Sequence, residues 1–234
     1  MPVKTTPARE RGGAAGERER IAKRLFDCGA VAVLRLPRAD DALAVIEALH
    51  AGGVSAIEVT VTTPDALTII EQAARLEGVL VGVGSVLDAD TARRAVDAGA
   101  RFVVSPVFQA EVVAEAHRMG VPAGPGAFTP TEILRAHRSG AEVVKVFPAD
   151  VLGLPFLKGV LAPMPFLKLM PTGGVTPENA GDWLRAGAAV VGLGSALIDP
   201  ALVATRDFAA LTARACRLAL SVADARGTSS GGAR

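Results

Sequence analysis

The stretch EVVKVFPAD, residues 142–150, predicts a short buried strand with a lysine in its middle. Residues 143–147 are apolar except for Lys145, and Gly140 and Pro148 bound the run, as is typical of a buried strand. The chain has only five lysines against twenty arginines, so a lysine inside a strand needs an explanation. It either reaches the rim of the fold or pairs with a buried carboxylate, or it is an amine that attacks a carbonyl carbon to form a Schiff base.

Short apolar stretches recur on both sides of this strand, and each is followed by a segment with helical periodicity. The last of these segments predicts one long helix from about Pro200 to Asp224. Eight strands with intervening helices and short loops predict an α/β fold, a single (β/α)8 TIM barrel, and the alternative is a doubly wound open sheet. The expected strands are 31–35, 55–61, 79–83, 101–105, 121–125, 141–147, 165–170 and 188–194.

The barrel is expected to occupy residues 20–225, with no second domain and no long internal linker. A short amphipathic helix beginning near Ile21 precedes the first strand. Residues 1–19 are rich in glycine and charge and predict a disordered tail, and residues 226–234 predict a flexible C-terminal tail.

Composition excludes several classes of function. Half of the 234 residues are hydrophobic and the formal net charge is +1, which gives no electrostatic case for nucleic acid or an anionic membrane surface. No apolar run reaches the roughly 18 residues of a membrane span, and the N-terminus has no apolar signal-peptide core, so we expect a cytoplasmic protein. Two cysteines and three scattered histidines offer neither a disulfide framework nor metal-ligand spacing, so no metal is expected.

Polar residues fall at the carboxyl ends of the predicted strands, where barrel enzymes place their chemistry. Glu58 and Thr62 share the face of strand 55–61 that would point into the barrel, because strand side chains alternate. Arg35 closes strand 31–35, and Lys145 lies late in its own strand. A buried Glu58–Lys145 pair that serves only the fold is the alternative to catalysis, but such pairs stabilise little because desolvation offsets their attraction.

Glycine-bearing loops follow three of the strands: GVGS (82–85), PTGGVTPEN (171–179) and GLGS (192–195). Loops after the last two strands of a barrel commonly hold a phosphate with their backbone N–H groups. Glycine also serves tight turns, so a single loop could be purely structural. The pairing of two such loops favours a phosphate site.

Taken together, the motifs resemble one family, the class I aldolases of 2-keto-3-deoxy-6-phosphogluconate (KDPG) and 4-hydroxy-2-oxoglutarate (KHG). The resemblance covers about residues 21–222, and the motifs occur in the order and at the spacing of that family. They are VAVLR, GGVSAIEVT, VGVGSVL, AGARFVVSP, PGAFTPTE, KVFPAD, PTGGVTPEN and GLGSAL.

The resemblance implies a (β/α)8 barrel in which Lys145 forms the Schiff base and Glu58 is the general acid/base. It implies no cofactor beyond the covalent imine, no metal, a sugar-acid phosphate substrate and commonly a homotrimer. The substrate-binding residues that it implies are Arg35, Thr62, Ser85, Pro106, Phe147 and Thr172. The phosphate-binding residues are Gly173, Gly174, Gly194 and Ser195.

Two departures from the family pattern concern the substrate. Thr62 replaces an arginine that the best-known enterobacterial members carry, and Ser85 replaces a threonine. The resemblance therefore leaves open whether the substrate is KDPG, its C4 epimer 2-keto-3-deoxy-6-phosphogalactonate, or KHG. An epimerase or isomerase on the same kind of barrel, and a catalytically silent barrel that binds a sugar phosphate, also remain open.

Overall fold

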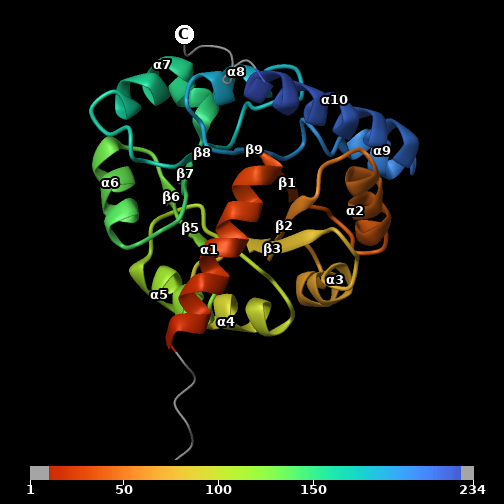
Figure 1. Cartoon of the computed structure of the whole chain (residues 1–234). Helices are drawn as coiled ribbons and strands as arrows, with labels where there is room; N and C mark the ends of the chain where they lie inside the picture. The colour runs from red at the N-terminus through yellow and green to blue at the C-terminus, as the bar shows by residue number, and fades with distance from the viewer. Residues whose placement is uncertain (1–10, 228–234) are drawn as a thin grey trace, which may run out of the picture.

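The computed structural model describes residues 11–227, which fold into parallel β-strands surrounded by α-helices (Figure 1). The strands form a six-stranded sheet in the order β5-β4-β3-β2-β1-β9 and a three-stranded sheet in the order β6-β7-β8. The first sheet is curled. The strands are β1 (Ala30–Leu34), β2 (Ala56–Thr60), β3 (Leu80–Gly84), β4 (Val103–Val104), β5 (Ala123–Gly124), β6 (Gly126–Ala127), β7 (Val144–Val146), β8 (Leu169–Pro171) and β9 (Val191–Leu193).

Helices follow the strands along the chain and pack around the outside of the sheets (Figure 1). The helices are α1 (Arg11–Cys28), α2 (Ala42–Ala51), α3 (Ala66–Ala73), α4 (Ala89–Asp97), α5 (Ala110–Arg118), α6 (Pro130–Arg138), α7 (Ala149–Leu161), α8 (Ala180–Arg185), α9 (Pro200–Ala204) and α10 (Phe208–Gly227). The predicted alternation of strand and helix is confirmed except that β6 follows β5 with no helix between them, which makes nine strands among residues 11–227 instead of the expected eight.

The two sheets approach each other at two places. Pro125 alone separates β5 from β6, and its carbonyl still accepts a hydrogen bond from the Lys145 N–H, at 2.9 Å. Of the expected strand 121–125 only β5 is extended, and β6 follows beyond Pro125 as a strand that was not expected, because proline has no N–H to donate to a ladder and interrupts the pairing. On the other side, Thr172 after β8 forms an isolated parallel bridge with Gly192 of β9.

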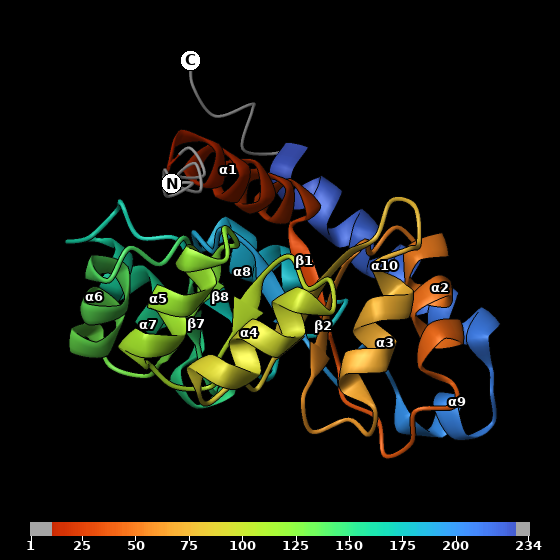
Figure 2. The same ribbon diagram turned by 90° about the horizontal axis from the view of Figure 1, so that it is seen from below.

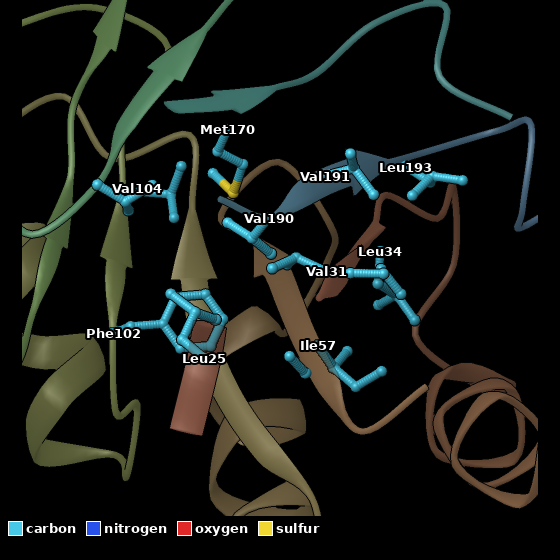
Figure 3. Packing of buried hydrophobic residues seen from close by; sticks show 14 of the residues in the cluster. Leu25, Val31, Leu34, Ile57, Phe102, Val104, Met170, Val190, Val191 and Leu193 are labelled. Carbon is cyan, nitrogen blue, oxygen red and sulfur yellow. The ribbon is translucent and has the colours of Figure 1, made fainter. Parts of the chain in front are cut away.

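The hydrophobic core fills the space between the strands and the helices. Figure 3 shows buried side chains from α1 (Leu25), β1 (Val31), β2 (Ile57), β8 (Met170) and β9 (Val191) in one cluster. Alternation along β2 sends Ile57 into this core and leaves Glu58 on the other face.

The helix at the N-terminus differs from the prediction. It begins at Arg11 rather than near Ile21, so residues 11–19 are helical and the predicted disordered tail is wrong for them. The rest of that tail, residues 1–10, lies outside the described residues. Figures 1 and 2 show α1 lying across one end of the set of strands. Ion pairs and buried residues on α1 outweigh the low helix propensity of its glycines.

The long helix expected from Pro200 to Asp224 is also wrong, because the chain breaks into α9 and α10. Arg206 adopts a positive φ of 54° between them, which a right-handed helix cannot include. The Asp207 carboxylate then accepts the Ala210 N–H at 2.9 Å and restarts the helix. Helix α10 runs to Gly227, and residues 228–234 of the predicted flexible tail lie outside the described residues.

Within the described part of the chain, no helix is both long enough and apolar enough to cross a bilayer.

Candidate active site

A buried ion pair joins the two sheets at the centre of the fold. Lys145 Nζ on β7 lies 3.5 Å from Glu58 Oε1 on β2, and their side chains are 6% and 0% exposed. The two strands belong to different sheets, so the side chains meet between the two sheets. The predicted inward orientation of both residues is thereby confirmed.

Glu58 is unusual because neither of its carboxylate oxygens has a hydrogen-bond partner within residues 11–227. The 3.5 Å approach of Lys145 compensates its charge, but no N–H or O–H satisfies its lone pairs. A buried carboxylate in this state costs several kcal/mol relative to one in water. A substrate hydroxyl or a water that entered the site would find a strong, unused acceptor there.

Gly84 makes the room that Glu58 occupies. A Cβ atom built on Gly84 would lie 1.9 Å from Glu58 Oε1, far inside van der Waals contact. Thr60 and Gly84 are register partners on β2 and β3, two residues beyond the pair of Glu58 and Gly82. The absence of a side chain on Gly84 at the end of β3 therefore leaves the space that the Glu58 carboxylate occupies.

Three threonine hydroxyl groups contact one another at the carboxyl end of β2. Thr60 Oγ1 lies 2.9 Å from Thr62 Oγ1 and 3.3 Å from Thr63 Oγ1. Thr63 Oγ1 also accepts the Leu36 N–H, at 3.3 Å. Thr60 and Thr63 are buried while Thr62 is exposed, so the three hydroxyls lead from the interior to the surface.

The other predicted substrate-binding residues lie at the carboxyl ends of their strands. Arg35 follows β1, and its Nη2 lies 3.4 Å from the hydroxyl of Ser85, which follows β3. Phe147 follows β7 and places its ring centroid 5.3 Å from Lys145 Nζ. Pro106 lies two residues beyond β4, and its backbone passes so close to Gly126 that a Cβ there would clash.

Thr172 and the predicted phosphate loops lie side by side. The bridge between Thr172 and Gly192 brings the loop after β8 next to the loop after β9. A Cβ on Gly192 would lie 2.3 Å from Thr172 Oγ1, so glycine is required for this approach. Gly174 has a φ of 69° and lies against Asp150 at the start of α7, which only glycine accommodates without strain.

Several backbone N–H groups in these two loops donate no hydrogen bond to a described residue. Among the hydrogen bonds of residues 11–227, none is donated by the N–H of Gly174, Ser195 or Ala196. The loop after β8 is nevertheless fixed, because Asn179 Nδ2 donates to the Gly174 carbonyl at 2.9 Å and its Oδ1 accepts the Thr176 N–H at 2.8 Å. Backbone N–H groups that have no other partner and are held in a rigid loop can donate hydrogen bonds to an anionic oxygen.

The structure therefore brings the predicted residues to the same end of the strands, with Lys145 and Glu58 buried beneath them. Sequence reasoning did not select Thr63 or Ser105, which are 2% and 1% exposed. Each is a polar residue at or beyond the end of a strand, and this position could have indicated from the sequence that it lies near the site.

The opposite end of the strands has different properties. A cavity of about 630 Å³ lies between α1 and the starts of β3 to β5, and it contains neither Lys145 nor Glu58. Residues 11–227 contain no cluster of three or more His, Cys, Asp or Glu side chains arranged to hold a metal ion.

Comparisons with known proteins agree with this geometry. The family described as KDPG and KHG aldolase matches residues 21–214. A probable 2-dehydro-3-deoxy-6-phosphogalactonate aldolase of Rhizobium meliloti is 37% identical over 177 residues, 74% of this chain and 84% of that protein. A 2-dehydro-3-deoxy-phosphogluconate aldolase of Treponema pallidum is 37% identical over 187 residues, 78% of this chain and 88% of that protein.

A solved structure with the same fold is that of KDPG aldolase from Legionella pneumophila, with pyruvate captured at low pH as a covalent carbinolamine intermediate. It has a TM-score of 0.78 and 29% sequence identity, and the alignment covers 84% of this chain and 97% of that one. The fold, the buried lysine–glutamate pair and these similarities lead to one conclusion: the chain belongs to the KDPG and KHG aldolase family, and it is an aldolase, a lyase.

Proposed function

We propose that the chain is a class I aldolase that cleaves KDPG to pyruvate and glyceraldehyde 3-phosphate through a Schiff base on Lys145. The observation that carries this proposal is the buried pair of Lys145 Nζ and Glu58 Oε1, 3.5 Å apart, in which Glu58 has no hydrogen bond. An amine and a carboxylate held this close in a dry site can exchange protons with one substrate. Cleavage of KHG to pyruvate and glyoxylate requires the same groups.

The chemistry begins when the Lys145 amine attacks the C2 ketone carbon of the substrate. Loss of water from the resulting carbinolamine gives a protonated imine. Glu58 then takes the proton of the C4 hydroxyl, the C3–C4 bond breaks, and its electron pair moves towards the imine nitrogen. The aldehyde leaves and an enamine remains on the lysine. Protonation of the enamine at C3 by Glu58 and hydrolysis of the imine release pyruvate and restore both residues.

Substrate binding follows from the position of the rim residues. Arg35, Ser85 and Thr62 offer a guanidinium and two hydroxyls for the C1 carboxylate, and Arg35 already lies 3.4 Å from the Ser85 hydroxyl. Pro106, Phe147 and Thr172 would line the sides of the site. The 6-phosphate would lie on the loops with unused N–H groups, formed by Gly173, Gly174, Gly194 and Ser195. No metal and no cofactor take part in this scheme.

The C4 epimer of KDPG is a second candidate substrate. The relative from Rhizobium meliloti is named for the galactonate-derived compound, and the one from Treponema pallidum for the gluconate-derived compound, at the same 37% identity. The two compounds differ only at the hydroxyl that Glu58 would deprotonate. The residues described above favour neither configuration.

The proposed arrangement is a closed barrel and an oligomer. The Thr172–Gly192 bridge on one side and the Pro125 junction on the other support a single closed (β/α)8 barrel. Exposed apolar side chains after β3, β4 and β6 (Leu87, Val107 and Phe128) and at the start of α7 (Val151) support self-association, for which we propose a homotrimer, because exposed apolar surface often marks a protein–protein contact.

The experiment that tests the function measures pyruvate release from KDPG, from its C4 epimer and from KHG. We expect cleavage of at least one of the two phosphorylated compounds. Lys145→Arg should abolish it, because arginine keeps the charge beside Glu58 but cannot form the imine. Lys168→Arg is the control, since Lys168 is exposed and precedes β8 at its amino end. Absence of pyruvate from all three compounds, or an active Lys145→Arg variant, would contradict the proposal.

A further inference from the structure

The loop between β9 and α9, residues 194–199, is held from behind by one arginine. Arg214 on α10 donates from Nη2 to the Ala196 carbonyl at 2.6 Å. Its Nη1 lies 3.5 Å from Asp199 Oδ2, and the Asp199 side chain accepts the Ala201 N–H at the start of α9, at 2.9 Å. One guanidinium therefore contacts both the middle and the end of the loop.

These contacts fix the peptide plane between Ala196 and Leu197. Arg214 binds the carbonyl of this peptide, and the N–H of Leu197 on its other side donates to the Gly194 carbonyl at 2.9 Å. The plane is thus held at both ends. The two amides directly before this plane, those of Ser195 and Ala196, donate no hydrogen bond within residues 11–227, and holding the plane restricts the backbone torsions that set their direction.

Arg214 is not an ordinary surface residue. Its side chain is only 27% exposed, and its Nε is buried and donates no hydrogen bond to any described residue. Burying part of a guanidinium costs free energy, and an apolar residue on the same face of α10 would avoid that cost. The neighbouring Arg217 differs, because it is 53% exposed and only approaches Glu178, at 3.8 Å.

We propose that Arg214 is a positioning residue that holds the N–H groups of Ser195 and Ala196 in the orientation that binds the phosphate of the substrate. This inference rests on the phosphate site proposed above. Charge-assisted bonds to a carbonyl are stronger than neutral ones, so the loop is rigid before the phosphate arrives. Arg214 acts through the backbone and does not touch the substrate. Arg214 holds the β9–α9 loop by donating to one of its carbonyls, as Asn179 holds the loop after β8.

The test replaces Arg214 with methionine and measures the affinity for inorganic phosphate by calorimetry, together with KM values. We expect about tenfold weaker phosphate binding and an about tenfold higher KM for the phosphorylated substrate, corresponding to about 1.4 kcal/mol. The KM for KHG, which has no phosphate, should change by less than about twofold. Arg214→Lys keeps the charge but loses the second contact, so its effect should be smaller, at about threefold.

Arg217→Met is the matched control on the same helix and should leave all three quantities unchanged. Unchanged phosphate affinity in Arg214→Met would overturn the inference, and so would an equal rise in KM for KHG and the phosphorylated substrate. Borohydride trapping of pyruvate on Lys145, measured in the same variants, reports on the aldolase mechanism separately. If pyruvate is not trapped in the unmodified chain but Arg214→Met still weakens phosphate binding, the Schiff-base mechanism is contradicted. The positioning role of Arg214 is supported in that case.

Discussion

Glu58 is a carboxylate that stability alone does not explain. It is fully buried, it has an ion-pair partner at 3.5 Å and it has no hydrogen bond within residues 11–227. Replacing such a pair with apolar residues is often neutral or stabilising. A lone pair kept free beside a buried amine is what proton transfer to and from a substrate needs.

Gly84 allows a direct test of the position of this carboxylate. Gly84→Ala would place a Cβ atom 1.9 Å from Glu58 Oε1 and force the carboxylate to move. We expect kcat for cleavage to fall by about a hundredfold, because a displacement of about 1 Å in a catalytic group costs about that much. Steady-state kinetics measures the change.

Gly82→Ala is the matched control on the same strand. Its Cβ would lie 2.5 Å from the Phe102 ring, so it should lower the melting temperature by overpacking while affecting kcat much less. Equal losses of kcat in the two variants would show that Gly84 serves packing rather than the position of Glu58.

Residue-scale prediction from the sequence succeeded for the orientation of Lys145 and Glu58, because a strand has a period of two and the polar residue in an apolar run must face a partner. The same reasoning could not identify Gly84 as the residue that makes room for Glu58, nor Arg214 behind the β9–α9 loop. Both depend on contacts between residues far apart in the sequence, which no local pattern encodes.

Among the helices and strands, α1 differs most from the sequence-based prediction, because it begins about ten residues earlier than expected. Gly12, Gly13 and Gly16 disfavour a helix, yet the chain is helical from Arg11. The helix lies at the amino ends of the strands (Figure 2). Arg18 Nε lies 2.6 Å from Glu142 Oε1, just before β7, and Arg24 donates to the Gly78 carbonyl, just before β3, at 2.6 Å. Such contacts cannot be predicted from the sequence alone, because they join residues that lie far apart along the chain.

Glu142 joins α1 to the amino ends of the strands, because it contacts Arg18, His117 and the Ala123 N–H. Burial on its own raises the pKa of the carboxyl group, but hydrogen bonds from His117 and the Ala123 N–H outweigh burial and hold the pKa below its ordinary value of 4.5. A carboxylate with a lowered pKa in the folded state stabilises the fold above its unfolded pKa. This contribution is lost as the pH falls through the ordinary value to the lower folded value.

Glu142→Gln should therefore lower the free energy of unfolding by about 1–3 kcal/mol at pH 7. The difference from the unmodified chain should shrink as the pH falls below the ordinary carboxyl pKa of 4.5, because the native carboxylate is then also protonated. Urea unfolding of both proteins at several pH values measures this difference in the free energy of unfolding. Glu111→Gln, an exposed change in the first turn of α5, is the control. A difference that stays constant with pH would contradict the assigned role of Glu142.

On the scale of the whole molecule, the sequence predicted the alternation of strands and helices because each apolar run must be buried and each loop is short. It did not predict the break between α9 and α10, since a positive φ at Arg206 has no sequence signature. It also did not predict β6, which begins directly after Pro125, where the expected strand 121–125 ends.

Self-association can be tested with two equally exposed apolar residues. Val151 at the start of α7 is 69% exposed and Leu220 on α10 is 70% exposed. Size-exclusion chromatography with light scattering should give about three times the 23.9 kDa of one chain. Val151→Glu should lower this mass, because a charge is costly in an apolar interface, and Leu220→Glu should not. A single-chain mass for the unmodified protein, or dissociation by Leu220→Glu alone, would contradict the proposed surface.

The most direct measurement of the central claim is borohydride reduction in the presence of pyruvate, followed by peptide mass spectrometry. An imine between pyruvate and a lysine amine is reduced to a stable secondary amine, so the adduct marks the lysine that reacted. We expect a pyruvate-derived mass on the peptide that contains Lys145, and no such mass in Lys145→Arg. A label on Lys158 or Lys168, or no label at all, would contradict it.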